Sequence, residues 1–152
     1  MARVAIVIGS ESDREIMSES GKYLDYFSIP WEMHVLSAHR NPEETAAFAK
    51  NAADDGISVI IAAAGMAAHL PGVIAAHTDL PVIGVPLDTS ALNGLDALYS
   101  IVQMPAGIPV GTVAIGKAGA RNSAVLAARI IALSDTGVRK KLDEFRRQGF
   151  KL

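Results

Sequence analysis

The sequence has 152 residues, which is the length of one domain, and we expect a single domain over residues 1–152. The formal net charge of −2 leaves no basic excess, so the composition argues against binding to nucleic acid or to an acidic membrane surface. Cysteine is absent, which excludes disulfides and thiol catalysis and suits a reducing cytoplasm. No signal peptide core and no apolar run of ~18 residues is present, so we expect a cytoplasmic protein.

Half of the residues are hydrophobic and only 20% are charged. A small domain has a large surface to cover with polar groups. So apolar a chain is expected to bury part of that surface against other subunits, although an alanine-rich core alone would give a similar composition. We therefore expect a homo-oligomer.

Short apolar runs alternate along the chain with segments of helical spacing. Strands are predicted at residues 4–8, 31–36, 58–64, 82–85 and 110–115. Helices are predicted at residues 16–27, 42–54, 73–77, 95–102 and 120–133, followed by a charged helix that ends at Gly149. This alternation predicts an α/β fold: a three-layer, doubly wound parallel sheet of the flavodoxin-like type, with about five strands and an added C-terminal helix.

In a parallel sheet, the loops that leave the strands lie at one edge. The loops at residues 9–13, 37–40, 65–72, 86–94 and 116–122 are therefore expected to meet. We expect the functional site at this carboxyl edge.

The first of these loops is suited to a phosphate. Ser10 and Ser12 offer hydroxyls, and the helix that follows offers unpaired backbone amides. Asp13 has the charge to accept hydrogen bonds from ribose hydroxyls. Helix capping by Ser12 and Asp13 would explain the same residues without any ligand.

The second loop carries a histidine and an arginine just before a strong helix start, Asn41 followed by Pro42. Arg40 is suited to bind a phosphate with two hydrogen bonds. His39 can exchange a proton near neutral pH. Ser37 begins the same loop.

In the third loop, small residues allow the backbone to approach a flat ligand closely. His69 is a second candidate acid or base there, and a purely structural role in fixing the loop is about equally expected. No group of residues has metal-site spacing, and the glycine motifs of dinucleotide and triphosphate sites are missing. We expect no bound metal, and the sequence argues against a dinucleotide or a nucleoside triphosphate as ligand.

Six stretches of the sequence carry a family resemblance. They are Gly-Ser-x-Ser-Asp at 9–13, Ser-Ala-His-Arg-x-Pro at 37–42, Ala-Ala-His-Leu-Pro-Gly at 67–72, Leu-Pro-Val-Ile-Gly-Val-Pro at 80–86, Ser-Ile-Val-Gln-Met-Pro at 100–105 and Ala-Ile-Gly-Lys-Ala-Gly-Ala at 114–120. In these stretches the chain closely resembles the N5-carboxyaminoimidazole ribonucleotide mutase family, the class I PurE type, over nearly its whole length.

The resemblance implies an enzyme of purine biosynthesis that moves a carboxylate from an exocyclic amine to a ring carbon. In the family's usual account the carbamate loses carbon dioxide, the ring carbon captures it, and a histidine removes the ring proton. By motif position that histidine is His39, and His69 lies in the ring and carboxylate pocket. The substrate-binding residues implied or expected are Ser10, Ser12, Asp13, Ser37, Arg40, Gly65, Ala68 and Leu70. The resemblance also implies a cofactor-free octamer that is functionally coupled to the ATP-dependent synthetase that forms the carbamate.

Two positions depart from the family pattern. Position 66 is Met where the family loop usually has a second glycine, and position 14 is Arg where Trp is common. Either departure could change substrate preference.

Two alternatives stay open. One is direct carboxylation of aminoimidazole ribonucleotide by carbon dioxide, a lyase-type reaction. The other is a non-catalytic nucleotide-binding module, because a fold alone does not fix a function.

Overall fold

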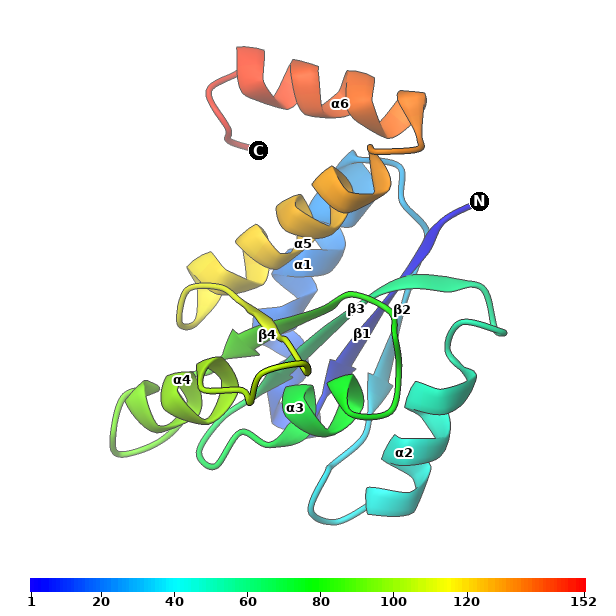
Figure 1. Ribbon diagram of the computed structural model, residues 1–152. Helices are drawn as coiled ribbons and strands as arrows, with labels where there is room; N and C mark the ends of the chain where they lie inside the picture. The colour runs from blue at the N-terminus through cyan, green and yellow to red at the C-terminus, as the bar shows by residue number, and fades with distance from the viewer.

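The computed structural model describes residues 1–152 as a five-stranded parallel sheet with helices on both faces (Figure 1). The strands are β1 (Arg3–Ile8), β2 (Trp31–Val35), β3 (Ile57–Ala64), β4 (Val82–Pro86) and β5 (Gly111–Thr112). The helices are the 3-10 helix η1 (Glu11–Asp13), α1 (Arg14–Tyr26), α2 (Pro42–Asn51), α3 (Leu70–Ala75), α4 (Leu95–Val102), α5 (Lys117–Ile131) and α6 (Thr136–Arg147). This confirms the predicted fold class and the added C-terminal helix.

The strand order is β2-β1-β3-β4-β5, and all pairs are parallel. The chain therefore starts in the middle of the sheet, moves outward to β2, and then crosses to β3 on the other side of β1. Ligands of such sheets bind where the direction of winding reverses, outside the carboxyl ends of the strands. Here that point lies between β1 and β3.

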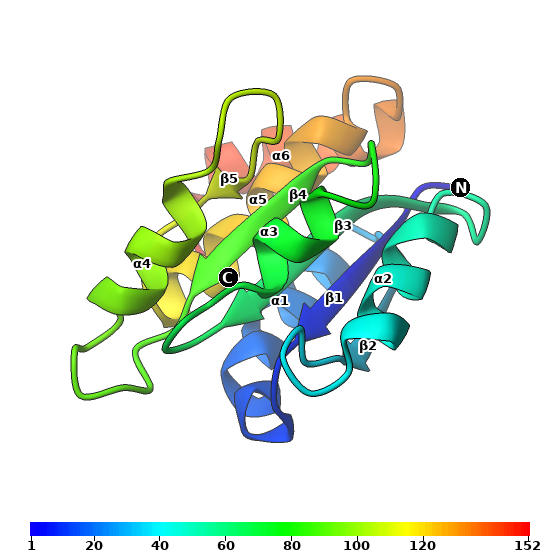
Figure 2. The same ribbon diagram turned by 60° about the horizontal axis from the view of Figure 1, so that its bottom comes forward.

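Two apolar cores hold the layers together, one on each face of the sheet. Helices α1 and α5 cover one face, and α2, α3 and α4 cover the other, as Figure 2 shows from the side of α3. The central strands β1 and β3 are almost fully buried because both of their faces are covered. This burial explains why their sequences are continuous apolar runs.

Helix α6 lies outside these layers and packs on α5 and α1 (Figure 1). Its Phe145 ring contacts Tyr23 and Tyr26 of α1 and Phe27 at the end of that helix, at 5.4–5.9 Å between ring centroids. This aromatic cluster, not the sheet, anchors the C-terminal helix. None of the helices in the fold is long and apolar enough to cross a membrane.

Several predicted boundaries were wrong: α2 ends at Asn51 and not at residue 54, and α5 spans Lys117–Ile131 and not 120–133. Helix α3 begins at Leu70 and not at residue 73, because a proline is tolerated in the first turn of a helix, and Pro71 occupies that place. The fifth strand is only Gly111–Thr112, although Val113 and Gly116 still donate backbone hydrogen bonds to the chain of β4. The expected loop at 116–122 is helical from Lys117 onward and does not reach the cavity described below.

Candidate functional site

A cavity of about 530 Å³ opens at the carboxyl edge of the sheet, at the reversal point between β1 and β3. This volume is in the range of small-molecule sites. Four loops line it, at residues Gly9, Ser10, Ser12, Asp13, Ser37, Ala38, His39, Arg40, Ala64, Gly65, Met66, Ala67, His69, Leu70 and Thr89. All predicted site residues are therefore brought together except Ala68, whose side chain is buried in the core under α3.

A larger cavity of about 960 Å³ lies at the opposite, amino edge of β4 and β5. His77 lines it, but none of the predicted site residues does. Nor does any part of the chain group three or more His, Cys, Asp or Glu side chains in a way that could hold a metal ion.

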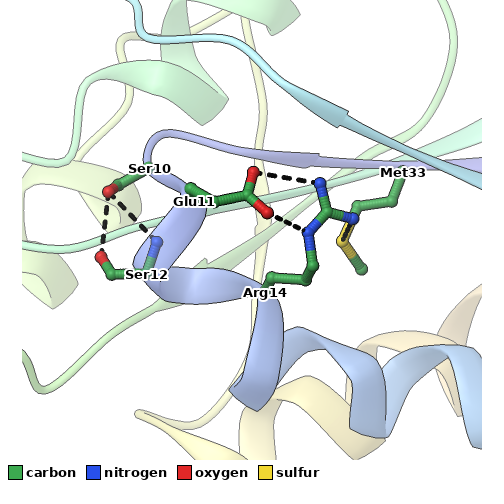
Figure 3. Close-up of polar contacts among 5 residues, drawn as sticks. All are labelled: Ser10, Glu11, Ser12, Arg14 and Met33. Carbon is green, nitrogen blue, oxygen red and sulfur yellow. Dashed lines mark hydrogen bonds and ion pairs between the residues drawn. The ribbon is translucent and has the colours of Figure 1, made fainter.

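The first loop is tied by its two serines (Figure 3). The Ser10 and Ser12 hydroxyls lie 2.9 Å apart, and Ser10 Oγ accepts a hydrogen bond from the Ser12 amide at 3.4 Å. Ser10 thereby caps the 3-10 helix that leads into α1. The capping residue is thus Ser10, and not Ser12 or Asp13 as the alternative interpretation had it, and both serine hydroxyls still line the cavity.

The side chain of Arg14 is held away from the cavity. Its guanidinium forms an ion pair with Glu11, and one nitrogen lies 3.5 Å from the sulfur of Met33 in the neighbouring strand (Figure 3). Arg14 is not among the cavity residues. The departure from the family pattern at position 14 therefore acts on the surface of the first loop and not on the ligand space.

Asp13 is a buried carboxylate, only 6% exposed, that lines the cavity. Burial raises the pKa of this carboxyl above its ordinary value of 3.8, and a backbone hydrogen bond from Ser10 partly opposes the rise. Its side chain caps no backbone amide of α1. Apart from the hydrogen bond from Ser10, the carboxylate can therefore accept hydrogen bonds from a ligand.

The second loop is closed by its own polar groups. Ser37 Oγ accepts a hydrogen bond from the Arg40 amide at 3.1 Å, and Asn41 Oδ1 accepts one from the Ser37 amide at 3.4 Å. Asn41 occupies the predicted N-cap position of α2, but its side chain turns back to the loop and does not cap the helix. The Arg40 guanidinium makes no ion pair within the chain, so it can bind an anion in the cavity.

The two predicted histidines contact each other at the wall of the cavity. His39 Nε2 lies 2.7 Å from His69 Nδ1, and the ring planes cross at 77°. One of these nitrogens must donate and the other accept, so the two imidazoles share one hydrogen at this contact. This pair joins the loop after β2 to the start of α3.

The third loop contains a strained residue. Met66 has φ 57°, in the left-handed region that favours glycine, and its side chain is 63% exposed at the cavity. The usual glycine of the family at this position is explained by that backbone conformation. Met66 adopts it at a cost and does not point into the core.

The sequence prediction missed Thr89. It lies in the loop after β4 and lines the cavity beside Gly65. Only its place at the carboxyl edge of the sheet could have indicated it, since threonine in a loop belongs to no catalytic motif.

Comparisons with a family profile and with known relatives indicate the same family. A sequence profile described as AIR carboxylase matches residues 3–151. The chain is 53% identical over 146 residues to the N5-carboxyaminoimidazole ribonucleotide mutase of Escherichia coli K12, covering 96% of this chain and 86% of the relative. It is 54% identical over 143 residues to the mutase of the same name from Bacillus subtilis 168, covering 94% and 88%.

The fold agrees with these relatives. The crystal structure of Treponema denticola PurE superimposes with a TM-score of 0.88 at 27% identity, covering 97% of this chain and 91% of that chain. Family profile, relatives and structure all span nearly the full length. The chain therefore belongs to the AIR carboxylase family.

Proposed function

We propose that this chain converts N5-carboxyaminoimidazole ribonucleotide into 4-carboxy-5-aminoimidazole ribonucleotide in purine biosynthesis. The observation that carries the proposal is the His39–His69 pair, 2.7 Å apart, beside loops suited to a phosphorylated ribose. Relatives that are 51–55% identical bear the mutase name. The enzyme is an isomerase, and it requires no cofactor.

The first two loops bind the ribose phosphate. Ser10, Ser12 and the Arg40 guanidinium bind the phosphate, because the two hydroxyls and a cation without an ion pair all line the cavity. Asp13 accepts hydrogen bonds from the ribose hydroxyls. The remaining residues, Ser37, Gly65, Ala68 and Leu70, surround the base and the carboxylate, Ala68 through its backbone alone.

The histidine pair moves one proton within the site. His39 donates a proton to the exocyclic nitrogen as the bond from that nitrogen to the carboxylate carbon breaks and carbon dioxide forms. The ring carbon then forms a bond to carbon dioxide, and His39 takes the proton that this ring carbon loses. The proton given and the proton taken balance, so His39 returns to its starting state.

The contact between the imidazoles engages His39 Nε2, which leaves His39 Nδ1 to exchange the proton with the substrate. If His39 Nε2–H donates to His69 Nδ1, then His39 Nδ1 is the atom that gives and takes the proton. His69 keeps this tautomer in place and stabilises the charged form of His39. Small residues around the pair keep carbon dioxide close to the ring carbon, where proximity can be worth about 7–11 kcal/mol in favourable cases.

Replacing His39→Asn tests the proposal. We expect ligand binding to be retained and turnover to fall by ~10²-fold or more, as for removal of a general acid or base. His77→Asn is the matched control, because His77 lies in the other cavity. Unchanged turnover in His39→Asn would show that His39 is not the proton carrier, and binding without any turnover in the wild type would favour a non-catalytic module.

An isotope experiment distinguishes the mutase reaction from direct carboxylation by free carbon dioxide. Labelled bicarbonate is supplied while the carbamate substrate turns over. We expect little label in the product, because the carbon dioxide stays trapped. Rapid incorporation would support the carboxylase reaction instead.

The proposal includes the assembly of this single domain into a homo-oligomer. Apolar side chains are exposed on α4 (Leu95, Tyr99 and Val102) and in the turn before it (Leu92), and they supply a contact face for a homo-octamer. The octamer works in the cytoplasm and takes its substrate from the ATP-dependent synthetase that forms the carbamate. Light scattering after gel filtration measures the assembly, and a monomeric mass would reject it.

A further inference from the structure

Thr89 lines the cavity from the loop that follows β4. A Cβ atom built on Gly65 would lie 2.2 Å from Thr89 Oγ1, so this hydroxyl sits directly over the Gly65 backbone. The Thr89 hydroxyl can occupy this position because residue 65 is a glycine, which has no Cβ atom to clash with it. Thr89 thereby joins the loops after β3 and β4 on one side of the cavity.

Among the hydroxyls that line the cavity, only that of Thr89 has no partner within the chain. Ser10 and Ser12 pair with each other, and Ser37 accepts from the Arg40 amide. A threonine hydroxyl can donate one hydrogen bond and accept others. The Thr89 hydroxyl is therefore the one with its full hydrogen-bonding capacity open to a ligand.

The position of Thr89 assigns it to the base end of a nucleotide. The phosphate-binding groups Ser10 and Ser12 follow β1, and Thr89 follows β4, two strands away. Neighbouring strands lie about 4.8 Å apart, so these groups are separated by roughly 10 Å along the edge. This separation matches the distance from the phosphate of a ribonucleotide to its base.

We propose that Thr89 is a specificity residue, whose hydroxyl forms a hydrogen bond with the polar edge of the base. The proposal rests on the proposed function, because it takes the ligand to be the aminoimidazole ribonucleotide. The partner is the exocyclic nitrogen or the carboxylate, both of which can bind a hydroxyl.

Three variants test it. Thr89→Val keeps the shape and removes the hydroxyl, Thr89→Ser keeps the hydroxyl, and Thr136→Val is the matched control. Thr136 is exposed at the start of α6, far from the cavity, and its hydroxyl also makes no hydrogen bond within the chain. We measure kcat/KM with the carbamate substrate and the inhibition constant of ribose 5-phosphate, which has no base.

We expect kcat/KM to fall about 10-fold in Thr89→Val and to stay within about 2-fold of wild type in Thr89→Ser and Thr136→Val. Inhibition by ribose 5-phosphate should be unchanged in all three. Wild-type kcat/KM in Thr89→Val would overturn the proposal, as would an equal loss of ribose 5-phosphate binding. An inactive wild-type enzyme would overturn the proposed function itself, so the two failures are distinguishable.

Discussion

The left-handed backbone of Met66 gives a sharp prediction about stability. An L-residue with φ 57° carries a cost of about 1–2 kcal/mol relative to the right-handed conformation. Glycine avoids this cost, but its greater freedom in the unfolded chain lowers the free energy of unfolding by about 0.5–1 kcal/mol relative to alanine. Met66→Gly should therefore be more stable than Met66→Ala by roughly 0.5 to 1 kcal/mol.

Comparing these two variants removes the contribution of the methionine side chain. That side chain is 63% exposed, so about a third of a full burial, or roughly 0.5–1 kcal/mol, is lost in both variants. Met66→Gly should consequently have nearly wild-type stability, and Met66→Ala should be less stable than the wild type.

The assay is equilibrium urea unfolding at one fixed protomer concentration, because assembly makes stability depend on concentration. Ala47→Gly is the control, since Ala47 is exposed within α2 and glycine should destabilise that helix by about 1 kcal/mol. If Met66→Ala is as stable as Met66→Gly, the backbone at this position is not left-handed in solution and the reasoning fails.

Three further substitutions test the electrostatics and packing. Hydrogen bonds from Lys22 and Arg121 lower the pKa of Glu19 to about 2, so Glu19→Gln should lower the urea midpoint at pH 7. The difference between variant and wild type should vanish as the pH falls from 4.5 to 2, where the carboxylate becomes protonated. An equal difference at pH 7 and at pH 2 would contradict this. Burial raises the pKa of Asp13, so its ionised form is disfavoured in the folded state. Asp13→Asn should therefore raise the urea midpoint at pH 7, whereas below pH 3.8 the midpoint should equal that of the wild type. The affinity for the substrate should fall in this variant. Gly21→Ala would place a Cβ 2.5 Å from the Trp31 ring. We expect the free energy of unfolding to fall by about 1–3 kcal/mol and the fluorescence of this single tryptophan to shift. An unchanged spectrum would show that the ring moves freely.

Much of the fold could be predicted because its signals are local. The apolar runs of β1 and β3 follow from burial on both faces, and Asn41-Pro42 marks the start of α2 correctly. The errors arose where one signal has two readings. Pro71 and Gly72 are typical of a loop, yet a proline is equally compatible with the first turn of α3.

The site could be predicted as a set of loops, because parallel topology brings strand ends together. What the sequence could not supply was the contact between side chains from different loops. The 2.7 Å approach of His39 to His69 depends on two rotamers and on the place of α3. Thr89 was missed for the same reason, since its importance comes only from its position over Gly65.

The two possible reactions differ in their proton balance, which bears on the single mobile proton assigned to the His39–His69 pair. In the mutase reaction the exocyclic nitrogen gains a proton and the ring carbon loses one, so turnover leaves the pH unchanged. Direct carboxylation starts from a free amine, and the ring proton has no acceptor in the product, so each turnover releases one proton to solvent. In the proposed tautomer the histidine pair accommodates one mobile proton, on His39 Nδ1, and returns it within the cycle. We therefore expect, in weakly buffered solution, product from the carbamate without proton release. Faster product formation from aminoimidazole ribonucleotide and carbon dioxide, with one proton released for each product, would contradict the mutase reaction.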